Sequence, residues 1–186
     1  LRRMTKPLLI AANKIDVEGA VFNFHRMQKE FPEMTIIPCS AEAELALKEA
    51  TKHGLIEYIP GEDHFKIHEE KVNEKQKNAL EFIKKNVLEQ FGSTGVQQVL
   101  DKTVFDFLGY IAIFPGGLHN LQDKDGRYIP DCFLLRNGST ALDFAFKIHT
   151  DIGNHFIKAI DVKKRIPVSK DHLLKHRDVI EIKTNI

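Results

Sequence analysis

The sequence predicts an α/β fold in its first part and an α+β fold in its last part, joined by a helical segment. In the first part, short apolar runs alternate with helical patterns, as they do in proteins built on a parallel sheet. In the middle, apolar residues recur at helical spacing among many charges. In the last part, short strand patterns surround one short helical pattern. We therefore expect three regions, at residues 1–59, 60–109 and 110–186.

Four elements are expected in the α/β part. They are a buried strand over 8–12, a helix over 21–31, a strand over 35–38 and a helix over 42–53. Pro32 ends the first helix, and Gly54 supplies the C-terminal stop of the second. Two strands do not form an independent sheet of this kind. We therefore expect the remaining strands before Leu1, in a longer protein.

The rest of the chain changes from helical to β patterns. Apolar faces predict helices over about 69–90 and 96–108, separated by the break at 92–95. Strands are then expected at 111–114, 132–135, 156–162, 165–168 and 179–183, with a short helix through Phe146 capped by Ser139 or Thr140. Five short strands with one helix are typical of a β-grasp-like α+β domain.

Composition excludes several classes of partner. The formal net charge is +1, which predicts no strong whole-molecule attraction to DNA or to an anionic membrane. No apolar run approaches the ~20 residues that a membrane helix needs. Cys39 and Cys132 lack metal-ligand spacing, which favours a reduced compartment. We therefore expect a cytoplasmic protein without a membrane or DNA partner.

Two polar loops follow the two strands of the α/β part. Asn13-Lys14-Ile15-Asp16 comes directly after the first strand, and Cys39-Ser40-Ala41 follows the second. Open α/β sheets bind ligands at the carboxyl ends of their strands. These loops are therefore the candidate binding site.

The residue types in these loops suit a guanine base. The ionised carboxylate of Asp16 accepts hydrogen bonds at two oxygens, so it matches the N1–H and N2–H₂ donors of guanine. The methylene stem of Lys14 can lie over a flat ring. Asn13 can hold the loop and reach the base, the Ala41 N–H can approach O6, and Ser40 can brace the loop of Asp16. The competing interpretation is that Asn13 and Asp16 only cap the next helix.

The two loops resemble the fourth and fifth motifs, NKxD and SA, of translation-factor-type GTPases. That resemblance implies that Asp16 and the Ala41 N–H read the base, that Lys14 covers it, and that Asn13 and Ser40 support the loops. The segment 140–151 resembles the signature of TGS domains, and 156–159 and 173–182 match the rest of that pattern. Together these features resemble the Obg-like GTPases, including their DRG and YchF-like branches, in an archaeal or eukaryotic form.

The resemblance implies GTP as ligand, with Mg²⁺ and hydrolysis, and a link to the ribosome. The phosphate-binding motif G-x-x-x-x-G-K-[S/T] does not occur in the sequence, so we expect the Mg²⁺ ligands and catalytic groups outside this chain. Asp123-Lys124-Asp125-Gly126 matches D-x-x-G formally, but we interpret it as a hairpin turn. The alternative function is a non-catalytic TGS module that docks on RNA or protein. The sequence before Leu1 would discriminate the two.

Several other residues are candidates for a function. Lys158, Lys163, Lys164 and Arg165 form a candidate RNA contact, with an ordinary solvated turn as the alternative. His64 and His68 are expected to be solvated helix residues rather than zinc ligands. His149 is a candidate ligand or RNA contact, with a packing or helix-ending role as the alternative. Cys39 is expected to be a buried small residue rather than a nucleophile.

Overall fold

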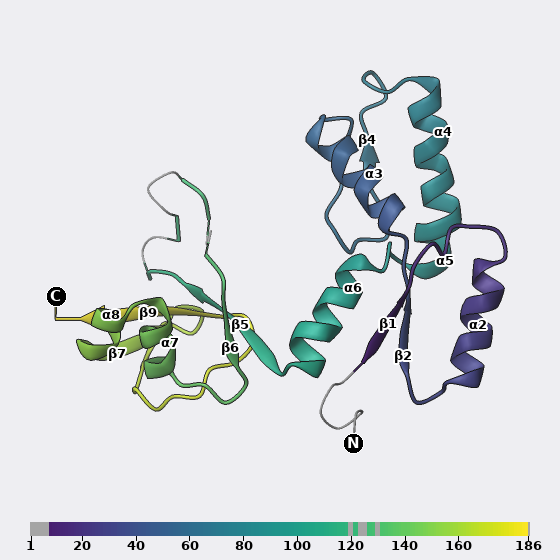
Figure 1. The fold of residues 1–186 in the computed structure, drawn as a ribbon. Helices are drawn as coiled ribbons and strands as arrows, with labels where there is room; N and C mark the ends of the chain where they lie inside the picture. The colour runs from purple at the N-terminus through teal and green to yellow at the C-terminus, as the bar shows by residue number, and fades with distance from the viewer. Residues whose placement is uncertain (1–7, 119–120, 123–125, 129–130, 186) are drawn as a thin grey trace. The chain divides into compact units, whose positions relative to one another are not determined.

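The computed structural model describes residues 8–118, 121–122, 126–128 and 131–185 (Figure 1). The chain forms two compact units, Leu1–Thr103 and Val104–Ile186. The turn expected at Asp123-Lys124-Asp125-Gly126 lies largely outside the described residues. No helix within the described ranges has both the length and the apolar character to cross a membrane.

A parallel strand pair positions the two polar loops. Strand β1 (Leu9–Ala12) pairs with β2 (Thr35–Pro38), with Ile10 opposite Ile36. Helix α2 (Ala20–Glu30) connects them and runs beside the pair (Figure 1). Its buried Phe24 packs with Ile15 and Ile36 in one apolar cluster, so the first loop is anchored to this core through Ile15.

A second apolar cluster holds the helical part of the first unit. Its helical elements are α3 (Ala41–Lys52), α4 (Glu74–Ile83), the π-helical η1 (Lys84–Leu88), α5 (Glu89–Phe91), α6 (Val96–Asp101) and η2 (Lys102–Phe107), the last crossing into the second unit. Leu47 of α3 and Val87 of η1 are fully buried in this cluster. The helix expected from residue 69 begins later, because Asn73 and Gln76 form a capping box at the start of α4.

A short hairpin, which periodicity did not predict, precedes α4. Strands β3 (Ile56–Glu57) and β4 (Lys66–Ile67) pair in an antiparallel manner. Ile56 is buried in the same cluster as Leu47. Strands of two residues are too short to show an alternating pattern.

The second unit is the expected α+β domain. Its five-stranded sheet has the order β6-β5-β9-β7-β8. The elements are β5 (Tyr110–Pro115), β6 (Phe133–Arg136), α7 (Ala141–Ile148), α8 (Thr150–Asn154), β7 (Phe156–Asp161), β8 (Ile166–Val168) and β9 (Asp178–Thr184). Thr140 caps α7 through a capping box with Asp143, as one of the two expected caps. Phe144 of α7 is fully buried against Ile113 and Ile180 of the sheet.

Candidate nucleotide-binding site

Backbone hydrogen bonds join the two candidate loops. The N–H of Ile15 donates to the carbonyl of Cys39 over 3.1 Å, and the N–H of Cys39 donates to the carbonyl of Ala12 over 3.0 Å. These bonds continue the pairing of β1 and β2 beyond the strands. The loops therefore lie side by side at the carboxyl ends of both strands, where the sequence placed a ligand site.

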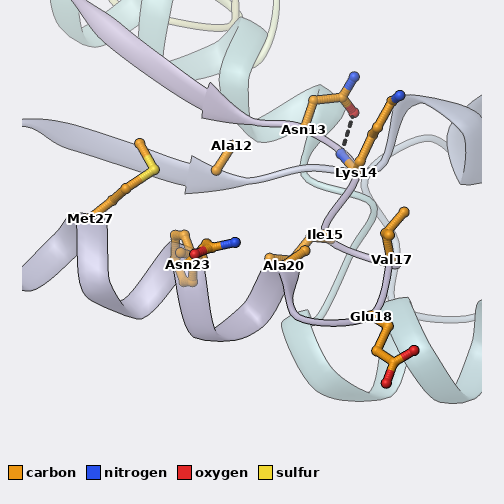
Figure 2. A pocket seen from close by; sticks show the side chains of 10 residues that line it. Ala12, Asn13, Lys14, Ile15, Val17, Glu18, Ala20, Asn23 and Met27 are labelled. Atoms are coloured by element: carbon orange, nitrogen blue, oxygen red, sulfur yellow. Dashed lines mark hydrogen bonds between the residues drawn. The ribbon is translucent and has the colours of Figure 1, made fainter.

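The side chain of Asn13 bridges the loops. Its Oδ1 accepts hydrogen bonds from the backbone nitrogens of Lys14, at 2.8 Å, and Ala41, at 3.0 Å. Figure 2 shows the first of these bonds as a dashed line. In this structure the Ala41 N–H, expected to approach a guanine oxygen, is thus directed into the site and engaged by Asn13.

Lys14 has a backbone conformation that residues other than glycine rarely adopt. Its φ is +65°, in the left-handed region. The hydrogen bond from its N–H to Asn13 helps to maintain this geometry. Figure 2 shows the Lys14 side chain extended beside the Asn13 amide, on the same side of the loop. The stem is exposed and free to cover a flat ligand.

Asp16 carries an unsatisfied acceptor. The residue is partly buried, and within the described part of the chain its Oδ1 is buried without any hydrogen-bond partner. A buried carboxylate oxygen without a donor costs free energy, so the geometry calls for a donor from outside. The competing capping interpretation fails, because α2 begins at Ala20 with Gly19 at its N-cap and no side-chain cap.

Ser40 is fully buried and serves the helix that follows it. Its Oγ accepts a hydrogen bond from the Ala43 N–H at 3.1 Å, which makes it the N-cap of α3. The hydroxyl that we expected to brace Asp16 thus caps α3. The same cap fixes Ala41 as the first residue of the helix, where backbone N–H groups point outward and attract electronegative atoms.

A cavity of about 290 Å³ lies on the α2 side of the first loop. Asn13, Lys14 and Ile15 line it together with α2 side chains such as Asn23 and Met27 (Figure 2). The residues of the second loop and Asp16 are absent from its lining. Asn13 thus lines this cavity and also bonds to Ala41, which lies outside the cavity lining.

The other thiol and imidazole candidates have structural roles. Cys39 is buried, and burial followed by the nearby Glu44 carboxylate raises the pKa of its thiol, which disfavours a nucleophile. His149 caps α8, because its Nδ1 accepts from the Asp151 N–H at 3.1 Å. His149 is exposed and is also the C-cap of α7, so these contacts agree with the helix-ending interpretation.

The helical placement expected for His64 and His68 is wrong. They flank the short strand β4 rather than share a helix. His64 Nδ1 lies 2.7 Å from Asp63 Oδ1, and His68 Nε2 lies 3.3 Å from Glu57 Oε1. Among the described residues, one group of three side chains could gather round a metal ion, namely the exposed Glu62, Asp63 and His64.

Two of the four basic residues proposed to contact RNA, Lys163 and Lys164, form hydrogen bonds within the second unit. Lys163 Nζ donates to the Arg177 carbonyl at 2.6 Å, and Lys164 Nζ donates to the buried Asp161 carboxylate, also at 2.6 Å. Lys164 therefore closes the turn between β7 and β8, and Lys163 ties this turn to the segment before β9. Lys158 and Arg165 are exposed, and Arg165 has a φ of +58°.

One element of the site was not identified from the sequence. The segment Gly92–Gly95 was interpreted only as a helix break, yet the carbonyl of Thr94 accepts the N–H of Ser40 at 2.9 Å. A contact between residues so distant in the chain leaves no periodic signal. The glycine on each side was the one available hint, since glycine permits close backbone approach.

Comparison with known proteins places both units in families. A family model described as Obg-like GTPase YGR210-like, G4 motif-containing domain, matches residues 11–116. The TGS domain model matches residues 120–184. The chain is 47% identical over 184 residues to an uncharacterized GTP-binding protein of Methanocaldococcus jannaschii, covering 98% of this chain and 46% of that protein.

Two further relatives agree with this placement. The crystal structure of a GTP-binding protein from Pyrococcus horikoshii has 39% identity and a TM-score of 0.65, covering 98% of this chain and 47% of its own. An uncharacterized GTP-binding protein of Schizosaccharomyces pombe is 28% identical over 144 residues, covering 73% of this chain and 35% of its own. The chain thus spans less than half the length of these relatives. It belongs to the Obg-like GTPases, in the YGR210-like group, and contains their G4 motif-containing domain followed by a TGS domain.

Proposed function

We propose that the first unit reads the guanine base of GTP. Asp16 accepts the N1–H and N2–H₂ groups, Lys14 covers the ring, and the Ala41 N–H donates to O6. Asn13 and Ser40 hold these groups in place through the loop bridge and the α3 cap. The observation that carries the proposal is the buried Oδ1 of Asp16, which has no donor within the described residues.

Guanine binding requires a change at Ala41. Its N–H donates to Asn13 Oδ1 in this structure. An incoming O6 either shares this proton or replaces the Asn13 oxygen. Replacement of Asn13 Oδ1 by O6 conserves the hydrogen bond from the Ala41 N–H. Either oxygen would lie at the N-terminus of α3, where the helix dipole favours partial negative charge.

The activity of the intact protein follows as a wider proposal. We propose that it binds GTP with Mg²⁺, whose ligands lie outside this chain, and hydrolyses GTP to switch conformation in the cytoplasm. Its three parts would be residues 1–59 of the GTPase domain, a helical segment over 60–109 and a TGS-like domain over 110–186. Membership of the Obg-like GTPases supports this activity.

Calorimetric titration of the intact protein with GTP, ITP and ATP tests the proposal. Inosine lacks the 2-amino group, so ITP loses one of the two donors to Asp16, and adenine presents a lone pair at N1. We expect affinities in the order GTP, ITP, ATP, with about 1–3 kcal/mol separating GTP from ATP. Equal affinities for GTP and ATP contradict the proposal.

The second unit is proposed to dock on ribosomal RNA. Lys158 of β7 is the register partner of Lys183 of β9, and Arg165 is exposed in the turn that follows β7. Phosphate contacts by such cations make binding weaken as salt rises. Changing Lys158 and Arg165 together to alanine should reduce ribosome co-sedimentation and flatten its salt dependence. The changes Lys163→Ala and Lys164→Ala should instead lower stability, because these side chains bond to the Arg177 carbonyl and to Asp161.

The alternative, a non-catalytic TGS module, makes a different prediction. In a GTPase switch, co-sedimentation with ribosomes should depend on whether GTP or GDP is bound. Equal co-sedimentation with GTP and with GDP would favour the alternative function, a non-catalytic TGS module.

A further inference from the structure

Thr94 lies in a buried contact network behind the second loop. Its side chain is 1% exposed. Its carbonyl accepts the Ser40 N–H at 2.9 Å, and its Oγ1 donates to Glu44 Oε2 at 2.6 Å. One residue of the segment Gly92–Gly95 therefore contacts both the loop and the first turn of α3.

Glu44 depends on the hydroxyl groups around it. It is 5% exposed, and the same Oε2 also accepts from the Tyr58 hydroxyl at 2.9 Å. The other oxygen, Oε1, is buried without a hydrogen bond among the described residues, although Lys48 Nζ approaches it to 3.5 Å. Loss of the Thr94 hydroxyl would leave this carboxylate still less satisfied and would disturb the start of α3.

Gly95 presses the segment onto the backbone of the second loop. A Cβ on Gly95 would lie 1.9 Å from the Pro38 carbonyl oxygen and 3.0 Å from Cys39 Cα. No side chain fits at such a distance without backbone movement. Gly92 has nearly the same backbone, with φ of +74° against +79°, yet a Cβ there would meet nothing within 4 Å. A side chain would be strained by the positive φ at either glycine, but only at Gly95 would it also collide with the backbone of the second loop.

We propose that Thr94 and Gly95 are positioning residues for guanine recognition, an inference that rests on the proposed function of the first unit. They hold the Ser40 N–H and the Pro38 carbonyl, which flank the turn into Ala41. A hydrogen bond weakens steeply with distance and angle, so a small shift of this turn removes the Ala41 donor from O6. Asp16, on the other loop, keeps its contacts with N1 and N2.

The test compares GTP, ITP and 6-thio-GTP on the intact protein by equilibrium titration. Sulfur is a weak acceptor, so the ratio of GTP to 6-thio-GTP affinity reports the contact at O6. The ratio of GTP to ITP affinity reports the contact with Asp16. For Gly95→Ala we expect weaker GTP binding and the first ratio to fall about fivefold toward unity, with the second ratio retained. Gly92→Ala should keep both ratios at the wild-type values.

A milder pair of variants covers the case in which Gly95→Ala does not fold. Thr94→Val keeps the shape and the carbonyl but removes the hydroxyl, and it should lower the GTP to 6-thio-GTP ratio. Thr94→Ser retains the hydroxyl and should keep the GTP to 6-thio-GTP ratio at the wild-type value. An unchanged ratio in Thr94→Val overturns the inference. Wild-type protein that fails to prefer GTP over ATP instead refutes the proposed function itself.

Discussion

The Oδ1 atom of Asn13 lies 3.0 Å from the backbone nitrogen of Ala41, 28 positions later in the chain. This bond crosses from the end of β1 to the start of α3. Together with the backbone bonds at Ile15 and Cys39, it joins two loops from different strands into one continuous edge.

Replacing Asn13 with alanine should loosen this edge. The change removes the acceptor of both the Lys14 and Ala41 N–H groups and frees the strained Lys14 backbone to relax. We expect GTP affinity to fall about tenfold, equivalent to one or two hydrogen bonds. Fluorescence titration with a labelled guanine nucleotide measures this, and a melting temperature close to wild type would show that the fold is retained. Unaltered affinity would argue against a bridging role.

Ser40→Ala tests the α3 cap. The change deletes the acceptor of the Ala43 N–H, so the free energy of unfolding should fall by about 1 kcal/mol. Ser40→Gly is the control, because glycine at an N-cap loses only a few tenths of that energy. Urea denaturation measures both. A smaller loss in the alanine variant than in the glycine variant would contradict the assignment.

The raised pKa of Tyr58 predicts a loss of stability at alkaline pH. Burial, and then the hydrogen bond to Glu44, raise the pKa of Tyr58 to about 12. The folded state therefore favours the neutral phenol, and this stabilisation is complete below about pH 10 and lost as pH rises through 12. Tyr58→Phe should cost about 1 kcal/mol at neutral pH and flatten the decline between these values. Denaturation at several pH values tests it, and an identical slope in both proteins counts against the buried Glu44 contact.

Asp161 predicts the opposite dependence in acid. Burial alone raises the pKa of this carboxyl, but the hydrogen bonds and charge of Lys164 outweigh burial and hold the pKa below its ordinary value. The ionised form is favoured on folding, so its contribution is present above about pH 4 and lost as pH falls further. Asp161→Asn should lower the melting temperature by roughly 5 °C at pH 7. The difference should shrink toward pH 3, and a constant difference would exclude the ion pair as its cause.

Much of this arrangement was predictable from local pattern. The buried strands ending at Ala12 and Pro38, the helices that follow them and the capping residue Thr140 each leave a signal within a few residues. The Obg-like and TGS resemblance rested on such segments, and the family matches confirm it. The guanine roles of individual residues remain predictions.

The misses have two different physical causes. Two of them correspond to local signals, namely the capping box of Asn73 and Gln76 that starts α4 and the Ser40 cap that starts α3. The hairpin of β3 and β4 and the contact of Thr94 with Glu44 depend instead on packing between segments apart in the chain. Local propensity does not encode such contacts.

The most direct test of the account exchanges the acceptor for a donor at Asp16. Asparagine offers one oxygen to N1–H and one NH₂ group to the O2 of xanthine, whereas it repels the 2-amino group of guanine. Intact wild-type and Asp16→Asn proteins are titrated with GTP and XTP. The wild type should prefer GTP and the variant XTP, so the ratio of GTP to XTP affinity should differ between the two proteins by roughly tenfold or more. If Asp16→Asn keeps the wild-type preference for GTP over XTP, this carboxylate does not read the base and the proposed site is wrong.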